Sequence, residues 1–237
     1  MAIRTIGLDG DDTLWHSESH FVVTTDRLVE LVAPWLTEDA AVEGVEQRLL
    51  TVERRNLALL GYGVKAFTLS MVETAIEVTD GTVPAGAIQE ILAWGRDLLA
   101  HPVELLDGVA DTLQAVTGEF ELVLITKGDL LHQESKIARS GIEGLFSAIE
   151  IVSEKDPTTY RRVLERHGAA PEEFVMVGNS VRSDVLPVLE LGARAVHVPY
   201  HVTWALEHPE DSDAEFPTIA SLRELPPLLG EWDQRVP

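Results

Sequence analysis

Short apolar runs alternate with helix-like patterns over most of the second half of the chain. β-Branched, strand-like runs are predicted at residues 122–125, 149–152, 174–177 and 195–198. Apolar residues with helical spacing lie beside these runs, at residues 108–116, 130–139, 158–167 and 185–191. A further strand-like run at residues 3–8 begins the chain. Short strands separated by helices predict an α/β fold with a doubly wound parallel sheet and right-handed connections.

The stretch between the first strand and residue 105 has a different, purely helical pattern. Its apolar residues recur at helical spacing in four stretches, the first with Leu28, Leu31, Val32, Trp35 and Leu36, the second with Val42, Val45, Leu49 and Val52, and two more at residues 68–79 and 84–100. Breaks are predicted at residues 34–38, 61–63 and 80–84. We therefore expect a four-helix domain at residues 17–103, inserted into a Rossmann-like core domain of residues 1–16 and 104–237.

Composition limits the partners and the compartment. The 237 residues are 45% hydrophobic and carry a formal net charge of -22, which disfavours binding to nucleic acid or to an anionic membrane surface. Cysteine is absent, which excludes disulfides, thiol nucleophiles and cysteine zinc sites. The sequence contains neither a signal-peptide core nor an apolar run of membrane-spanning length. These features predict a soluble cytoplasmic protein.

The first strand ends in Asp9-Gly10-Asp11-Asp12-Thr13-Leu14. Burying unpaired carboxylates costs on the order of several kcal/mol, so folding alone does not favour them at the end of a buried strand. Open α/β sheets bind ligands outside the carboxyl ends of their strands, and Gly10 is expected to let a ligand approach the backbone. The alternative is an acidic turn in which Asp12 or Thr13 caps the following helix.

Polar residues also follow the later strands, and in a parallel sheet these ends share one edge. The residues concerned are Thr126, Lys127, Gly128, Lys155, Asn179 and Asp184. Carboxylates and an amide without a soft ligand suit Mg²⁺, while a lysine and a hydroxyl suit phosphoryl oxygens. A carboxylate beside a divalent cation can act as a nucleophile, and a second carboxyl two residues later can serve as general acid and then base.

In this order the residues resemble the phosphatase branch of the haloacid dehalogenase superfamily, whose C1 members carry a helical cap after the first motif. The D-x-D-x-T-L motif matches in full at residues 9–14. The resemblance implies that Asp9 is the nucleophile of an aspartyl-phosphate mechanism and that Asp11 is the acid/base and also binds the metal through its backbone carbonyl. It further implies that Thr126 and Lys155 are catalytic and that Asp184 is a metal ligand. The fourth motif commonly reads G-D-x-x-x-x-D, so Asn179 departs from it by one negative charge and is a candidate metal ligand with a less defined role.

Substrate recognition is assigned to two groups of residues. Thr126, Lys127 and Gly128 are candidates at the sheet edge. Arg54, Arg55 and Lys65 supply three of the six cationic residues between Trp15 and Val103 and could hold an anionic group; the alternative is a solvated helix face with pairs such as the one with Glu53.

We therefore expect a Mg²⁺-dependent phosphohydrolase, a monomer or homodimer, that acts on a small phosphorylated metabolite while the cap excludes water. Four alternatives remain. A haloacid dehalogenase would need neither Asp11 nor a metal. A phosphonatase needs a cap lysine, for which Lys65 is the one candidate. A phosphomutase would reuse the aspartyl-phosphate, and a non-catalytic binding module would use none of this chemistry.

Overall fold

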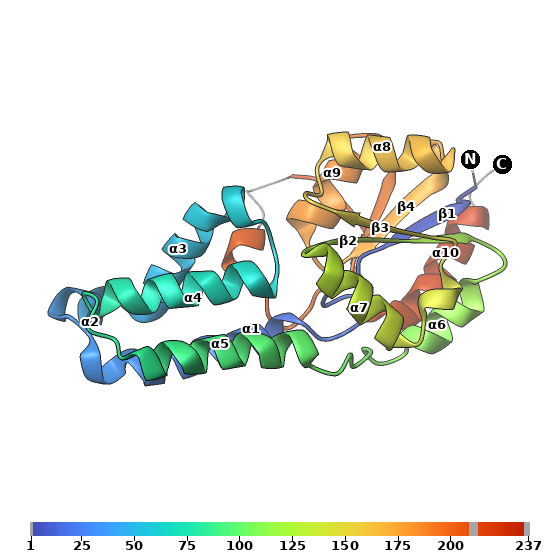
Figure 1. Ribbon diagram of the computed structural model, residues 1–237. Helices are drawn as coiled ribbons and strands as arrows, with labels where there is room; N and C mark the ends of the chain where they lie inside the picture. The colour runs from blue at the N-terminus through green and yellow to red at the C-terminus, as the bar shows by residue number, and fades with distance from the viewer. Residues whose placement is uncertain (1, 209–212, 235–237) are drawn as a thin grey trace. The chain divides into compact units, whose positions relative to one another are not determined.

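The computed structural model describes residues 2–208 and 213–234 (Figure 1). The chain divides into two compact units. The first consists of Met1–Glu18, Val103–Lys127 and Gln133–Pro237. The second consists of Ser19–Pro102 and Gly128–His132.

The first unit is built on a five-stranded, fully parallel sheet with the order β3-β2-β1-β4-β5. Its strands are β1 (Thr5–Leu8), β2 (Glu121–Lys127), β3 (Ala148–Val152), β4 (Phe174–Gly178) and β5 (Arg194–His197). This order places the first strand at the centre, with later strands added on each side. The predicted α/β class with a doubly wound parallel sheet is thereby confirmed.

Alternate side chains of the strands enter two separate cores. Ile6, Leu124 and Val177 belong to one core, whereas Ile125 and Met176 belong to the other. The first core is covered by α6 (Val109–Val116), α7 (Leu130–Ser140) and α10 (Leu225–Gln234), and the second by α8 (Pro157–His167) and α9 (Leu186–Leu189) (Figure 1). A sheet buried on both faces explains why its strands appear in the sequence as continuous apolar runs.

The second unit is helical and is inserted after β1, as predicted. Its helices are α1 (Glu18–Val32), the 3-10 turn η1 (Ala33–Trp35), α2 (Glu38–Glu43), α3 (Val45–Leu60), α4 (Val64–Val78) and α5 (Ala85–Ala100). Leu28, Leu49, Met71 and Ile91 are among the apolar residues of its core.

One predicted helix in this insert was wrong. The helical pattern through Val42 and Val52 is two helices, because Gly44 adopts a φ of 89° and ends α2 before α3 begins. The first helix ends at Val32, two residues before the break predicted at residues 34–38, since Pro34 lies in the 3-10 turn that contains Trp35.

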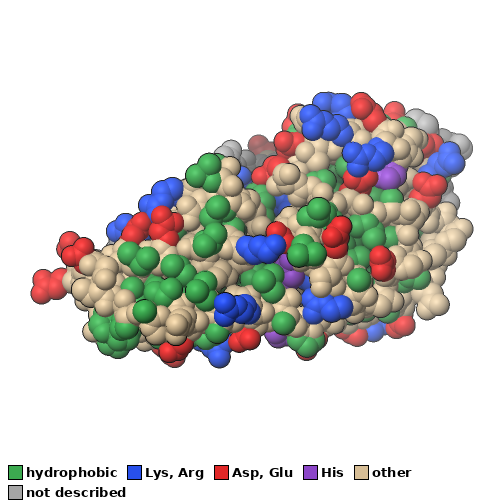
Figure 2. All heavy atoms as spheres, in the orientation of Figure 1, with side chains coloured by type: hydrophobic (Ala, Val, Ile, Leu, Met, Phe, Trp, Pro, Cys, Tyr) green, Lys and Arg blue, Asp and Glu red, His purple; other side chains and the backbone are tan. Residues whose placement is uncertain are grey.

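Some large apolar side chains of the insert stay on the surface. Leu59, Leu69 and Ile76 are exposed, and Figure 2 shows hydrophobic side chains gathered over α4 and α5. None of the helices within residues 2–208 and 213–234 combines the length and the apolar character needed to cross a membrane.

Candidate active site

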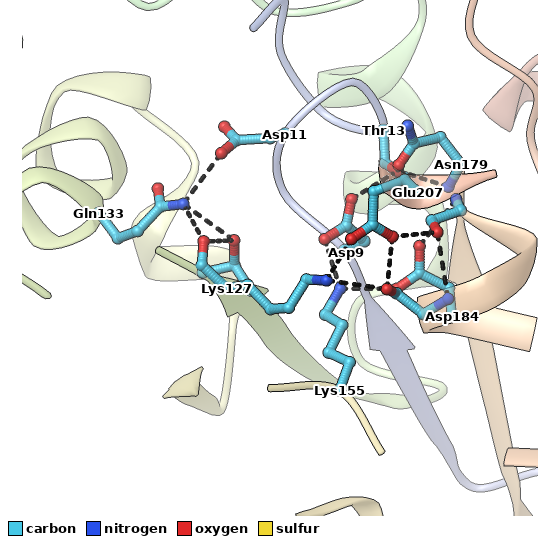
Figure 3. A network of polar contacts seen from close by, with 12 residues as sticks. Asp9, Asp11, Thr13, Lys127, Gln133, Lys155, Asn179, Asp184 and Glu207 are labelled. Atoms are coloured by element: carbon cyan, nitrogen blue, oxygen red, sulfur yellow. Dashed lines mark hydrogen bonds and ion pairs between the residues drawn. The ribbon is translucent and has the colours of Figure 1, made fainter. Parts of the chain in front are cut away.

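Asp9, Lys155 and Asp184 meet at the carboxyl end of the sheet in the first unit (Figure 3). Lys155 Nζ lies 2.5 Å from Asp9 Oδ1 and 2.6 Å from Asp184 Oδ1. All three side chains are buried. Asp9 follows β1, Lys155 follows β3, and Asp184 lies in the turn after β4, so the shared direction of the parallel strands brings together residues more than 140 positions apart.

This group has one carboxylate more than it has ammonium groups. Burial is the largest cause that raises the pKa of Asp9, to about 7; Asp184 also raises it, and Lys155 lowers it. The pKa of Lys155 is raised, because its attraction to Asp184 and Asp9 outweighs the opposing effect of burial. The site is therefore short of positive charge, as expected where a cation can bind.

Gly178 gives Asp184 the room to reach this position. A Cβ on Gly178 would lie 2.2 Å from Asp184 Oδ2, so a larger residue would displace that carboxylate. The same oxygen accepts a hydrogen bond from the backbone N–H of Ser180 at 3.0 Å. Asp184 itself lies in a single π-helical turn, Val181–Val185. Turns of this type occur frequently at functional sites.

The loop after β1 both contributes side chains to the active site and caps the first turn of α1. Thr13 Oγ1 donates to Asp9 Oδ2 at 2.9 Å and accepts from the backbone N–H of Asn179 at 3.0 Å, which joins the first and fourth motifs. Asp12 accepts from the backbone N–H groups of Ser17 and Glu18 at 2.8 and 3.0 Å, at the start of α1. The capping alternative thus holds for Asp12, alongside the carboxylate site and not in place of it.

Asp11 is turned away from Asp9 (Figure 3). It accepts hydrogen bonds from Lys136 Nζ at 2.5 Å, Trp15 Nε1 at 2.5 Å and Gln133 Nε2 at 2.9 Å. Burial raises the pKa of Asp11, but these three donors, Lys136 first, outweigh it and hold the pKa below its usual value. The sequence analysis missed Lys136 and Gln133, which lie on the buried side of α7.

Thr126 is buried at the end of β2 and accepts a hydrogen bond from Gln133 Nε2 at 3.2 Å. A Cβ on Gly10 would lie 2.7 Å from the ring of Trp15 and 3.3 Å from Thr126 Oγ1, so the packing of Trp15 requires a glycine here. Ligand approach to the backbone at Gly10 stays a prediction.

Lys127 makes close contacts with acidic and polar groups of the first unit. Its Nζ lies 2.5 Å from Glu207 Oε1, 2.9 Å from Ser183 Oγ and 3.4 Å from Glu154 Oε1. Glu207 was also missed by the sequence analysis. Gly128, which follows, has a φ of 137° and belongs to the second unit. Substrate binding by Lys127 and Gly128 stays a prediction.

Two of the three candidate cations of the insert, Arg55 and Lys65, have carboxylate partners within their own unit. Arg55 lies 2.8 Å from both Glu73 and Glu77, and Lys65 Nζ donates to the two oxygens of Asp129 at 2.9 and 3.0 Å. Arg54 is exposed. Arg55 thus forms pairs of the kind that the alternative anticipated, here with Glu73 and Glu77 of α4. Substrate binding by Arg54, Arg55 and Lys65 stays a prediction.

Comparison with known proteins shows the family. A model of the haloacid dehalogenase-like hydrolases matches residues 3–192. The chain belongs to this family. The hydrolase is 27% identical over 175 residues to N-acylneuraminate-9-phosphatase of Mus musculus, a match that covers 69% of this chain and 68% of that one. It is 26% identical over 239 residues to glyceraldehyde 3-phosphate phosphatase of Pyrococcus furiosus, covering 96% and 92% of the two chains.

A solved structure, a haloacid dehalogenase-like family hydrolase from Xanthomonas campestris, is 42% identical to this hydrolase. The two superpose with a TM-score of 0.88 over 99% of this chain and 93% of that one. The similarity therefore extends over both the sheet domain and the helical insert.

The hydrolase offers oxygen donors to a metal at this edge of its sheet. Within the part of the chain that the structure describes, no three histidine, cysteine or carboxylate side chains come together as a metal cluster. Asp9 and Asp184 supply two carboxylates, and the side-chain oxygen of Asn179 lies 3.4 Å from Thr13 Oγ1. Such a set is incomplete without water and substrate oxygens, which is how Mg²⁺ is usually bound in proteins.

Proposed function

We propose that this hydrolase is a Mg²⁺-dependent phosphatase that cleaves a small phosphomonoester through an aspartyl-phosphate on Asp9. The observation that carries the proposal is the buried group of Asp9, Lys155 and Asp184 at the carboxyl end of the sheet. Two relatives that cover most of the chain are phosphatases, which supports phosphomonoester chemistry over dehalogenation.

In the first half-reaction Asp9 attacks phosphorus. A bond forms between a carboxylate oxygen of Asp9 and phosphorus, and the bond from phosphorus to the substrate alcohol breaks. Asp11 donates a proton to the departing oxygen. Lys155 holds Asp9 in place and balances charge around the phosphoryl group, and the Thr126 hydroxyl is available to its oxygens.

In the second half-reaction Asp11, now ionised, takes a proton from water. That water attacks phosphorus, the Asp9–phosphorus bond breaks, and inorganic phosphate leaves with Asp9 restored. For either transfer, Asp11 has to exchange at least one of its contacts with Lys136, Gln133 and Trp15 for the leaving oxygen or the water. Loss of the Lys136 contact also removes the main attraction that lowers the pKa of Asp11, so that the carboxyl can carry the proton that it donates.

The donor set fits Mg²⁺. The buried carboxylates of Asp9 and Asp184 share a single lysine, and burial first, with Asp184 in addition, raises the pKa of Asp9. Asp9, Asp184, Asn179 and the backbone carbonyl of Asp11 are the proposed ligands. When bound, the metal neutralises the carboxylates and acts as a Lewis acid toward the phosphoryl oxygens.

Replacement of the nucleophile tests the proposal. Asp9→Asn keeps the shape of the side chain, and we expect turnover of p-nitrophenyl phosphate with Mg²⁺ to fall by at least about 10³-fold. The matched control is Asp107→Asn, which removes a largely exposed carboxylate of the same unit and should leave turnover unchanged. More than a few per cent of wild-type activity in pure, folded Asp9→Asn protein would contradict the role of Asp9.

A further inference from the structure

Glu207 brings a partly buried carboxylate, with 15% of its side chain exposed, to the active site from outside the family motifs. It ends η5 (Ala205–Glu207), in the loop after β5. Its carboxylate accepts hydrogen bonds from Ser180 Oγ at 2.6 Å, Ser183 Oγ at 2.5 Å and Lys127 Nζ at 2.5 Å (Figure 3). One side chain thus joins the end of β2 to the turn after β4.

Contacts other than the one with Lys127 fix the position of the Glu207 carboxylate. The two serine hydroxyls hold one oxygen, Oε2, and leave Oε1 for the lysine. The loop itself is held because the Arg182 guanidinium donates to the backbone carbonyl of Leu206, whose side chain is buried. Serines and loop together present Oε1 in a defined place.

Lys127 needs such a partner because only 12% of its side chain is exposed. A further acidic contact of Lys127, with Glu154, is longer at 3.4 Å, and 46% of the Glu154 side chain is exposed. Exposed pairs contribute little, whereas a short, buried, charge-assisted hydrogen bond is strong and directional. Lys127 Nζ also lies 2.9 Å from Ser183 Oγ, and Ser183 directly precedes Asp184, so Lys127 reaches the turn that carries the buried aspartate (Figure 3).

We propose that Glu207 is a positioning residue that holds Lys127 at the phosphate site, where Lys127 supplies a second ammonium group to the phosphoryl oxygens. This inference rests on the proposed phosphatase function. It assigns Ser180 and Ser183 the task of orienting Glu207, and Glu207 the task of orienting Lys127.

Two variants of Glu207 distinguish the effect of the position of its carboxylate from the effect of its charge. Glu207→Gln removes the charge and keeps the length, whereas Glu207→Asp keeps the charge and shortens the reach. If Glu207 only added negative charge, Glu207→Gln would strengthen the binding of inorganic phosphate. A positioning role predicts that both variants weaken phosphate binding in calorimetry with Mg²⁺ by about tenfold and raise KM for p-nitrophenyl phosphate to a similar extent.

A double variant tests whether Glu207 acts through Lys127. Lys127→Met alone should weaken phosphate binding by about tenfold, and adding Glu207→Gln to it should cause less than a twofold further loss. Asp107→Asn is the matched control for a carboxylate that pairs on the surface, with Arg223. A merely structural role would lower Tm while leaving KM and phosphate affinity of the folded protein unchanged, and this result would overturn the inference.

The outcomes also distinguish the inference from the proposed function. A wild-type enzyme that hydrolyses the ester, with Glu207 variants that match it, overturns the role of Glu207 alone. A wild-type protein that binds phosphate but hydrolyses no phosphomonoester overturns the proposed function, and the calorimetry still decides the role of Glu207. Failure of the wild type to bind phosphate at all overturns both.

Discussion

Asp9→Asn should stabilise the metal-free protein at neutral and alkaline pH. The pKa of Asp9 is raised from 3.8 to about 7, mainly by burial. The folded state therefore holds the Asp9 proton more tightly than the unfolded state does. As the pH rises from about 4 to about 7, ionisation of this carboxyl lowers the free energy of unfolding, by about 4 kcal/mol in all at about 1.4 kcal/mol per pH unit. Asparagine does not ionise, so the variant is spared this loss.

The assay is urea unfolding of both proteins in a chelating buffer, at several pH values from 5 to 8. We expect the difference in unfolding free energy, variant minus wild type, to increase by about 3 kcal/mol over this range, because part of the loss already occurs below pH 5. Asp12, whose pKa is also raised to about 7, is present in both proteins and cancels in the difference. Adding Mg²⁺ should stabilise the wild type more than the variant.

This reasoning would be refuted if the difference in unfolding free energy between variant and wild type did not change with pH. It would also be refuted if the wild type became more stable relative to the variant as the pH rises. Either result would mean that Lys155 fully compensates Asp9 and that the pair needs no further cation. The proposed metal site would then lose its electrostatic support, whatever the effect of the substitution on turnover.

Four further outcomes are expected. EDTA should abolish phosphatase activity, and Asp184→Ala should raise the Mg²⁺ concentration for half-maximal rate; full activity in metal-free buffer would instead indicate dehalogenase-type chemistry. Asn179→Asp should lower that Mg²⁺ concentration or leave it unchanged, and a clear rise would exclude Asn179 from the metal site. Lys136→Met should reduce kcat for p-nitrophenyl phosphate by at least about tenfold, with partial recovery in Lys136→Arg, because Asp11 loses one of its two closest donors; unchanged kcat would show that the contact has no role in turnover. Arg55→Met should leave KM for this ester unchanged, since Arg55 already pairs with acidic residues of α4. An increase in KM would indicate that Arg55 binds the substrate.

The sheet could be predicted from the sequence because apolar runs and helical patterns alternate regularly along the chain. Strands buried on both faces give continuous apolar runs, and each is followed by a helix, so class and insertion point were both recognisable. Helix boundaries in the insert were less predictable. Gly44 divides a pattern that is apolar on both sides, and Pro34 ends a helix whose apolar spacing continues to Trp35. Backbone conformation decides where these helices end, and the spacing of apolar side chains carries no information about that conformation.

The residues of the active site likewise divide into those that the sequence predicts and those that it does not. Convergence of Asp9, Lys155 and Asp184 follows from the rule that parallel strands end at one edge, so spacing along the chain does not matter. No such rule locates Gln133, Lys136 or Glu207. The first two depend on which face of α7 is buried, and Glu207 depends on the path of a loop after β5. Their side-chain types are those of ordinary surface residues.

One compositional signal did point to these contacts. The chain contains four lysines among 18 basic residues, at positions 65, 127, 136 and 155, and all its other basic residues are arginines. In the first unit, Lys155 contacts Asp9, Lys136 contacts Asp11 and Lys127 contacts Glu207, each at 2.5 Å. An ammonium group is a compact charge on a flexible stem, whereas a guanidinium is a planar fork with a different geometry of donors. In a chain with 40 acidic residues, these three lysines each contact a carboxylate near the edge of the sheet, and the substitution of arginine for each of them should cost activity despite the retained charge.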